Sequence, residues 1–212
     1  SSLPQQAKNS WFTFDHFYSD SSFDEALKIV FGNNTTNTLL DVGGNTGRWS
    51  LRCVSYNKNV NVTILDLPQQ INIMHENIKG KEGAERINGI GINLLDCESQ
   101  FPTDKHYDAI WMSQFLDCFG EGEIESILSR VEKIMNEGTR LYIMETLWDR
   151  QKYETAAFCL TQISLYFTAM ANGNSKMYNS DDLIKIINRV GLKVEKIHDN
   201  LGHGHSILVC RK

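Results

Sequence analysis

The chain alternates between two patterns of hydrophobic and polar positions. Short apolar runs rich in Val, Ile, Leu and Thr predict buried β-strands, and longer segments with apolar residues three or four positions apart predict amphipathic helices. The predicted strands cover residues 38–42, 60–66, 107–113, 139–145, 192–198 and 206–211, with another inside 86–95. The predicted helices cover residues 22–31, 49–56, 68–80, 121–135, 153–170 and 180–191, with Ser22 and Ser180 as N-caps.

Strands that alternate with helices predict a parallel sheet covered by helices on both faces. The turn at residues 199–205 is short enough to make the last two strands an antiparallel pair. The prediction is therefore a doubly wound, mostly parallel α/β sheet of seven strands with one strand reversed. Ligands of such sheets bind at the carboxyl ends of the strands, here the first, second and fourth.

The first predicted strand ends in a glycine-rich loop, residues 41–47, with the sequence Asp-Val-Gly-Gly-Asn-Thr-Gly. Glycines at this place let the backbone turn sharply and approach a ligand closely. A dinucleotide fingerprint that starts at Gly43 would need glycines where Asn45 and Arg48 stand. The spacing instead matches Asp-x-Gly-x-Gly-x-Gly with Asn45 in place of the middle glycine. The loop predicts a nucleotide-like ligand, and an ordinary strand-to-helix turn is the alternative.

An acidic residue ends the second predicted strand. Asp66 stands 19 residues after Gly47, close to the spacing at which such an acid meets ribose hydroxyls in nucleotide-binding sheets. A carboxylate can accept two hydrogen bonds from a cis-diol. Asp66 is therefore the predicted ribose ligand, and a solvated acid at a strand end is the alternative.

The composition fits a soluble globular protein and excludes several classes. The 212 residues carry a net charge of −5, whereas nucleic-acid-binding proteins usually present a basic face. No apolar run approaches the roughly 20 residues that span a bilayer, and no signal-peptide pattern opens the chain. We therefore expect a cytoplasmic protein without nucleic-acid or membrane partners. Its five scattered cysteines fit reduced thiols, each a small buried hydrophobe.

Several further segments, together with the glycine loop, resemble one family. They are similar to class I S-adenosylmethionine (SAM)-dependent O-methyltransferases, related to plant caffeate and flavonoid enzymes and to bacterial polyketide-tailoring enzymes. The motifs are Leu-Asp-Leu-Pro at 65–68, Asn-Leu-Leu-Asp at 93–96, Tyr-Asp-Ala-Ile-Trp-Met at 107–112, Tyr-Ile-Met-Glu at 142–145 and Ala-Asn-Gly at 171–173. The resemblance covers about residues 11–212 and implies a Rossmann-like sheet of order 3-2-1-4-5-7-6 with strand 7 antiparallel. It also implies a catalytic domain at 36–212, preceded by a helical extension at 1–35 on the substrate side.

The resemblance implies SAM as cofactor and no metal. In it, Gly43, Asn45 and Gly47 would border the methionine part of SAM, and Ser113 at the end of the fourth strand would lie against the cofactor.

The same resemblance assigns the nucleoside part of SAM to the next two strands. Asp66 would hold the ribose, and Leu67 would lie against the adenine. Asn93 stands where the family usually has an aspartate near the adenine amino group, and its amide oxygen can still accept that hydrogen bond. Leu94 would cover the ring.

The chain departs from the family at the catalytic base. Plant members have a histidine after the fourth strand, and this chain has Asp117 there. Carboxylates are weaker bases, with a reference pKa near 3.9 against about 6.5 for histidine, unless burial raises the value. Glu145 matches a glutamate that supports the histidine, so it is predicted to orient Asp117 or the substrate. Asp117 as the base and Asp117 as a capping acid both remain open.

Three histidines are further candidates for the base. His16 lies in an aromatic segment at residues 11–18, and His203 and His205 lie in the last turn. Methyl transfer from a sulfonium depends mostly on alignment, so a missing histidine leaves activity possible. The alternative is a degenerate methyltransferase fold that binds without chemistry. An NAD-linked oxidoreductase is disfavoured by the glycine spacing.

The acceptor is expected to be a small flat or aromatic molecule that is methylated on oxygen. The aromatic segment 11–18 and the apolar helix at 153–170 are the expected pocket walls. Full-length family members dimerise through an N-terminal domain that this sequence does not contain, so dimerisation is expected to depend on that domain.

Overall fold

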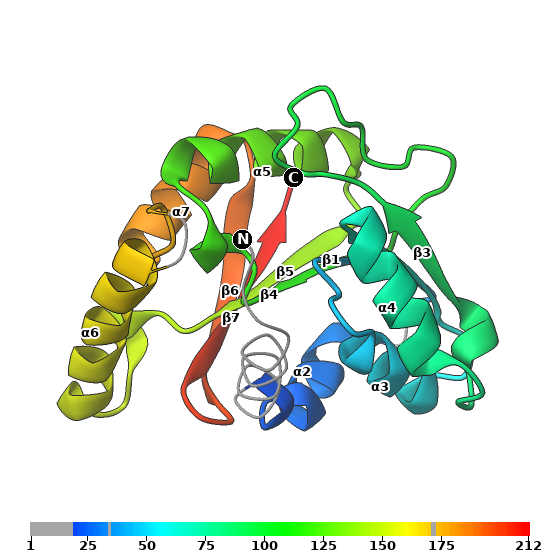
Figure 1. Ribbon diagram of the computed structural model, residues 1–212, viewed down its shortest axis with the longest axis horizontal. Helices are drawn as coiled ribbons and strands as arrows, with labels where there is room; N and C mark the ends of the chain where they lie inside the picture. The colour runs from blue at the N-terminus through cyan, green and yellow to red at the C-terminus, as the bar shows by residue number, and fades with distance from the viewer. Residues whose placement is uncertain (1–18, 34, 171–172) are drawn as a thin grey trace.

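The computed structural model describes residues 19–33, 35–170 and 173–212. Its centre is a seven-stranded sheet of order β3-β2-β1-β4-β5-β7-β6 (Figure 1). The strands are β1 (Thr38–Val42), β2 (Asn61–Asp66), β3 (Ile87–Gly91), β4 (Ala109–Ser113), β5 (Arg140–Glu145), β6 (Lys193–Leu201) and β7 (His205–Arg211). Neighbours from β3 to β5 pair in parallel, and β7 is antiparallel to both β5 and β6. The predicted topology is confirmed.

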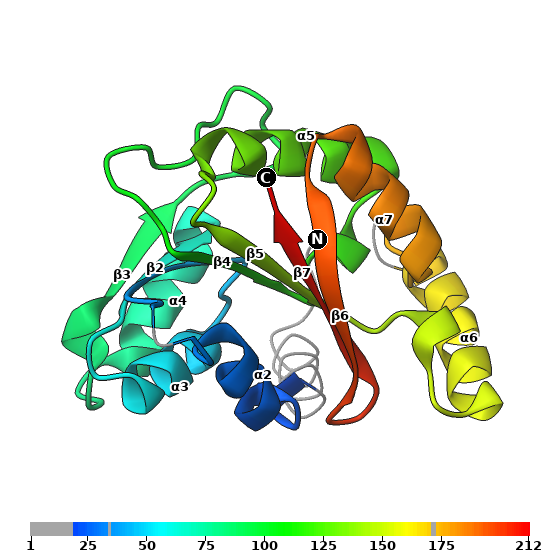
Figure 2. The same ribbon diagram turned by 180° about the vertical axis from the view of Figure 1, so that it is seen from behind.

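Helices cover both faces of the sheet, as Figures 1 and 2 show from opposite sides. One face carries α2 (Phe23–Val30), α3 (Arg48–Tyr56) and α4 (Pro68–Ile78), and the other carries α5 (Glu121–Ile134) and α7 (Ser180–Arg189). A further helix, α6 (Glu154–Met170), lies at the side of the molecule. Short 3-10 turns are η1 (Ala84–Arg86), η2 (Leu116–Cys118) and η3 (Trp148–Arg150).

Each face of the sheet has its own apolar core, because successive residues of a strand point to opposite sides. On the α5 side, the helical stripe of Ile124, Ile127 and Val131 is fully buried, as its spacing predicts. On the α3 side, Trp49 stacks on Trp111 of β4 with ring centroids 4.2 Å apart. Burial of each such side chain contributes about 1.5–3 kcal/mol. The two cores fix the sheet between its helices.

Some local predictions are corrected by the structure. The N-cap of α7 is Asn179, whose side chain accepts a hydrogen bond from the Asp182 amide, and Ser180 is the first helical residue. Ser22 does cap α2, but its hydroxyl makes no capping bond and instead lies 2.9 Å from Nδ1 of His205. The Ser22 hydroxyl therefore contacts a residue far along the chain and not a backbone amide of its own helix.

The cysteines also differ from expectation. Cys53 and Cys210 are buried, but Cys97, Cys118 and Cys159 are exposed, so the prediction of buried thiols is wrong for these three. Cys97 lies in the loop between β3 and β4, Cys118 ends the short turn η2, and Cys159 lies in α6. Residue type alone does not indicate these positions.

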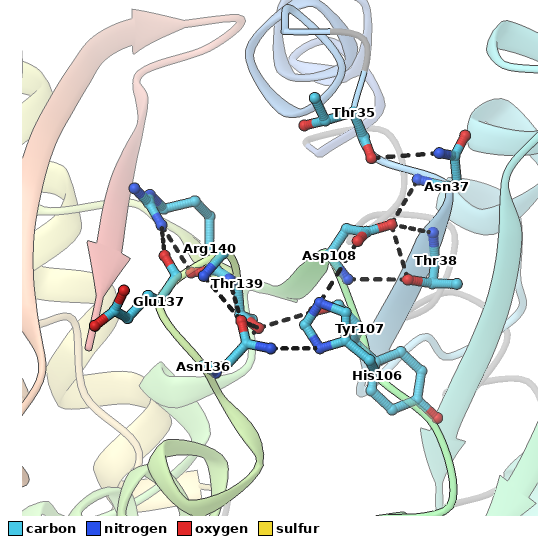
Figure 3. Close-up of polar contacts among 11 residues, drawn as sticks. Thr35, Asn37, Thr38, His106, Tyr107, Asp108, Asn136, Glu137, Thr139 and Arg140 are labelled. Carbon is cyan, nitrogen blue, oxygen red and sulfur yellow. Dashed lines mark hydrogen bonds and ion pairs between the residues drawn. The ribbon is translucent and has the colours of Figure 1, made fainter.

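A network of polar side chains and backbone groups joins the amino-terminal ends of the parallel strands (Figure 3). Oδ2 of Asp108 accepts hydrogen bonds from the Asn37 amide at 2.8 Å, the Thr38 amide at 2.9 Å and the Thr38 hydroxyl at 2.9 Å. The Thr139 hydroxyl donates to the Tyr107 carbonyl at 2.9 Å. Burial by itself would raise the pKa of Asp108, but these bonds and nearby His106 hold it below its ordinary value. The starts of β1, β4 and β5 are therefore tied together.

The helix α6 differs from the others because it is apolar on its outer side. Tyr153, which precedes it, and Phe158 and Leu165 within it are each more than 60% exposed, at 62%, 64% and 65%. Leu160 is buried. None of the described helices is both long enough and apolar enough to cross a membrane.

Candidate active site

The glycine loop joins β1 to α3 with three residues in the left-handed region. Gly43, Asn45 and Gly47 have φ values of 76°, 49° and 78°. Asparagine is one of the few side chains that tolerate this conformation, which explains how Asn45 can stand in a glycine position. A Cβ atom on Gly43 would lie 2.4 Å from the ring of Phe115. Only glycine lets the loop and this aromatic ring come so close.

Asp66 at the end of β2 is bonded to the loop. Its Oδ2 accepts the amide hydrogen of Asn45 at 2.9 Å, and its Oδ1 accepts that of Leu67 at 2.8 Å. The Asn45 side chain in turn accepts a hydrogen bond from Gln70 at 2.8 Å. Burial raises the pKa of Asp66, and the two backbone bonds partly offset that shift. Each carboxylate oxygen keeps a second lone pair, so the acid can still accept hydrogen bonds from a ligand.

These elements border a cavity of about 170 Å³ at the carboxyl ends of the strands. Five of the predicted cofactor residues line it, together with five further apolar side chains. The lining consists of Gly43, Leu65, Asp66, Leu67, Ile92, Asn93, Leu94, Leu95, Phe115 and Phe119. Its single acid lies among apolar and aromatic side chains, which suits a flat ring that carries a polar sugar.

Phe115 and Phe119 are lining residues that the sequence did not reveal as such. Their rings meet edge to face with centroids 4.9 Å apart. Both follow β4, where the chain turns at Gln114, a non-glycine residue with a φ of 45°. That turn brings Phe115 over Gly43. Two aromatic residues four positions apart after a strand were the only signal available.

Three predicted cofactor residues do not line this cavity. Gly47 is buried against α4, where a Cβ atom would lie 3.0 Å from both Met74 and Ile78. Asn45 holds Asp66 through its backbone amide. Ser113 is half-buried at the end of β4, opposite Met144 of β5. The roles of Asn45 and Gly47 toward the methionine part of SAM, and of Ser113 toward the cofactor, remain predictions.

Asp41, the acid that opens the loop motif, is buried in the α3 side of the sheet. Its Oδ2 accepts a hydrogen bond from the Ser50 hydroxyl at 2.6 Å. Burial raises the pKa of Asp41 to about 7, with the Ser50 bond lowering it and the charge of Asp66 raising it further. A Cβ atom on Gly44 would lie 2.8 Å from the same oxygen. Asp41 therefore contacts both the glycine loop, at Gly44, and the helix α3, at Ser50.

The two predicted catalytic acids lie close enough to interact. Oε1 of Glu145 accepts the amide hydrogens of Phe115 at 3.1 Å and Leu116 at 2.8 Å, at the start of the turn that carries Asp117. Oε2 is buried, and no described residue is its hydrogen-bond partner. Burial and the neighbouring charge of Asp117 raise the pKa of Glu145 well above its ordinary value. Glu145 thus favours the neutral acid, while half-buried Asp117 faces more solvent.

Two of the three histidine candidates for the base, His203 and His205, do not line the cavity. His205 is fully buried beside Ser22, and burial, with the charge of His203, lowers its pKa to about 4. His203 is exposed in the final turn and does not line the cavity. His16 lies outside the described residues. Within the part of the chain that the structure describes, no group of three or more His, Cys, Asp or Glu side chains is arranged as a metal site.

The strand order, the glycine loop after β1 and the acid after β2 together define a Rossmann-like domain of the methyltransferase type. The chain belongs to the O-methyltransferase domain family, whose model matches residues 21–192. Among characterised relatives, norreticuline-7-O-methyltransferase of Papaver somniferum is 26% identical over 187 residues, which are 88% of this chain and 48% of that enzyme. The chain therefore spans about half the length of this relative. The predicted family is confirmed.

Solved structures share the fold at low sequence identity. One is the O-methyltransferase NcsB1 from neocarzinostatin biosynthesis, in complex with SAM and 2-hydroxy-5-methyl naphthoic acid. It has a TM-score of 0.78 and 16% identity, with 96% of this chain and 57% of that chain covered. Another is an O-methyltransferase family 2 protein from Planctomyces limnophilus, in complex with apigenin. Its TM-score is 0.70 at 20% identity, with 82% and 50% covered. These similarities confirm the predicted fold class.

Proposed function

We propose that this chain is the catalytic domain of a SAM-dependent methyltransferase that methylates an oxygen atom of a small, flat acceptor. The observation that carries the proposal is the joining of Asp66 to the glycine loop through the Asn45 amide, at the rim of one cavity. Family membership supports the reaction class. No feature of the site favours the alternative of a fold that binds without chemistry.

The cavity residues fit the nucleoside part of SAM. Asp66 would accept the two ribose hydroxyls with the lone pairs that its backbone bonds leave free. Leu67 and Leu94 would lie on either side of the adenine, with Phe115 at its edge. Oδ1 of Asn93 already accepts the Leu95 amide at 3.1 Å, so it would use its second lone pair for the adenine amino group. Gly43 would face the methionine part, with Asn45, Gly47 and Ser113 nearby.

SAM, when bound, supplies a methyl group on a positively charged sulfur. The acceptor oxygen would take this methyl group, and the electron pair of the broken carbon–sulfur bond would stay on sulfur. The acceptor hydroxyl must lose its proton, and Asp117 is the proposed group that takes it. The main contribution of the chain is to align the reacting atoms.

Glu145 is proposed to set the position and charge of Asp117. It holds the two amides that precede Asp117, so it fixes the turn that carries the base. Because burial and the Asp117 charge raise its pKa, Glu145 is proposed to stay neutral and to carry its proton on Oε2. A neutral Glu145 would place no second negative charge beside Asp117, the proposed acceptor of the proton.

The acceptor is proposed to be a planar phenol-like molecule. The solved relatives named above hold a naphthoic acid and apigenin, and both ligands are flat and aromatic. None of the described residues of α6 lines the cavity already described. The exposed apolar side of this helix is therefore proposed to contact the acceptor rather than SAM. Dimerisation remains a proposal as well, and the sedimentation mass of the intact protein would test it.

The proposal is tested by calorimetry with SAM and S-adenosylhomocysteine, followed by a screen of phenolic acceptors. We expect both nucleosides to bind in one-to-one stoichiometry and one or more phenols to gain 14 mass units, the mass of a methyl group minus a proton. Failure of the intact protein to bind either nucleoside would refute the proposal. Binding of NAD instead would restore the oxidoreductase alternative.

A further inference from the structure

A buried arginine lies behind the cavity and is not explained by any role described so far. Arg130 belongs to α5 and is only 7% exposed. Its neighbours on the helix, Ile127 and Val131, belong to the apolar core. A buried guanidinium ordinarily needs a carboxylate or several hydrogen-bond acceptors, because removing its charge from water is costly.

Arg130 uses backbone carbonyls in place of a carboxylate. Nη2 donates to the Leu94 carbonyl, and Nη1 donates to the carbonyls of Asp96 at 3.1 Å and Ser99 at 3.0 Å. Nε donates to the Ser126 carbonyl, one turn earlier in α5, at 3.2 Å. The guanidinium also lies 5.8 Å from the centroid of the Phe101 ring. One side chain therefore holds three points of the loop that follows β3.

That loop forms one wall of the cavity. Ile92, Asn93, Leu94 and Leu95 all line it, and the first hydrogen bond of Arg130 is to the backbone of Leu94. The loop has no regular secondary structure between β3 and β4. A wall made of irregular backbone needs anchors from outside itself to keep a fixed distance from Asp66 on the other side.

We infer that Arg130 is a positioning residue for the adenine side of the cofactor site, and this inference rests on the proposed function. It acts through the Leu94–Ser99 backbone and sets the width of the slot that receives the ring. Lysine could keep the charge at this place but could not donate to three separated carbonyls, because it lacks the planar fork of arginine.

The chain contains a matched control. Arg86 is also largely buried, with 18% of its side chain exposed, and it donates to three backbone carbonyls where Arg130 donates to four. The three are those of Val54 at 2.7 Å, Asn57 at 3.0 Å and Val60 at 3.1 Å. None of these residues lines the cavity. A change at Arg86 therefore removes a similar carbonyl clamp without touching the cavity wall.

The experiment compares Arg130→Met, Arg130→Lys and Arg86→Met with the wild-type intact protein. Thermal unfolding, calorimetric Kd values for S-adenosylhomocysteine and for adenosine, and turnover at saturating SAM are measured for each. We expect both methionine variants to unfold at lower temperature. Arg130→Met should raise both Kd values on the order of tenfold, about 1.4 kcal/mol of binding free energy, because the cavity wall loses its anchor. Its kcat should be nearly unchanged, because the methionine part and the base are not displaced.

The two Kd values should rise by the same factor, since the wall contacts the part that both ligands share. Arg130→Lys should lie between wild type and Arg130→Met, and it replaces the methionine variant if that protein does not fold. Unchanged Kd values in the Arg130 variants, or an equal rise in Arg86→Met, would overturn this inference alone. Wild-type protein that binds no S-adenosylhomocysteine would overturn the proposed function and this inference together.

Discussion

The amino and carboxyl edges of the parallel strands both hold buried or half-buried carboxyl groups, but in opposite settings. At the amino edge, Asp108 accepts three hydrogen bonds and its pKa lies below the ordinary value (Figure 3). At the carboxyl edge, burial raises the pKa of Asp41, Asp66 and Glu145. At the amino edge hydrogen bonds satisfy the charge and tie the strands together. At the carboxyl edge burial disfavours the charged form of all three acids, and one of them, Asp66, lines the cavity.

The contrast indicates that the acid at the amino edge stabilises the folded domain, whereas the acids at the carboxyl edge lower its stability. A carboxylate with a lowered pKa stabilises the folded state at neutral pH, and one with a raised pKa destabilises it. Groups with raised pKa values are concentrated at functional sites, because such groups can exchange protons or accept ligand hydrogen bonds. Changes at the carboxyl edge should therefore affect activity and binding, and changes at the amino edge should affect stability.

The largest effect is expected from Asp117→Asn at the carboxyl edge. An amide cannot take the acceptor proton, so kcat should fall on the order of 100-fold, which is typical for loss of a general base. Affinity for S-adenosylhomocysteine should stay nearly unchanged. Asp181→Asn, which alters an exposed acid in the first turn of α7, is the control. Equal turnover in wild type and Asp117→Asn would refute the role of the base.

The second effect concerns the ribose ligand. Asp66→Ala removes two proposed hydrogen bonds to the diol, so the Kd for S-adenosylhomocysteine should rise on the order of 100-fold, which corresponds to about 1.4 kcal/mol for each bond. Asp66→Asn, which keeps one acceptor oxygen, should bind with intermediate affinity. Calorimetry measures both. If Asp66→Ala binds as tightly as wild type, Asp66 does not contact the ribose.

The third prediction tests the opposite edge. Asp108→Ala leaves the amides of Asn37 and Thr38 without their acceptor, so the free energy of unfolding should fall by about 2–4 kcal/mol. Denaturant titration measures this change. The Kd for S-adenosylhomocysteine, measured well below the unfolding temperature, should not change. Asp104→Asn, an exposed acid four residues earlier, should alter neither quantity. A weakened Kd in Asp108→Ala would mean that the two edges are coupled.

The smallest effect is the pH dependence that Asp41 contributes. Its folded pKa of about 7 lies above the unfolded value, so the folded state binds more protons and stability falls as pH rises toward and through 7. Between pH 6 and 8 this loss should be about 1 kcal/mol. Asp41→Asn should lack it, so the variant should gain stability relative to wild type as pH rises. Parallel pH curves for the two proteins would show that Asp41 does not titrate in this range.

The fold was predictable because its signals are local. Most strands of the parallel core are largely apolar runs that are buried on both faces (β1, β2, β4 and β5), whereas the edge strand β3 is partly exposed. The α5 stripe has clear helical spacing. The reversed strand followed from a turn too short for a crossover. Gly43 and Asp66 were predictable as cavity residues for the same reason, since Gly43 directly follows β1 and Asp66 ends β2.

The rest of the site depends on contacts between distant parts of the chain. Phe115 reaches Gly43 only because Gln114 adopts a left-handed conformation, which its residue type does not predict. Arg130 stands in a helix whose polar positions ordinarily face solvent, and its acceptors are carbonyls about 30 residues away, which carry no side-chain signal. Outside the site, the contact of the Ser22 hydroxyl with His205 also joins distant parts of the chain.

The stacking of Trp49 on Trp111 gives the protein a built-in optical reporter. Trp49 lies in the first turn of the helix that follows the glycine loop, and Trp111 lies in β4. Two indoles with centroids 4.2 Å apart and planes 20° apart couple their electronic transitions. Such coupling produces a paired band in the ultraviolet circular dichroism whose shape depends on the relative orientation of the rings. Any ligand that shifts the start of α3 would therefore change the spectrum of the unlabelled protein.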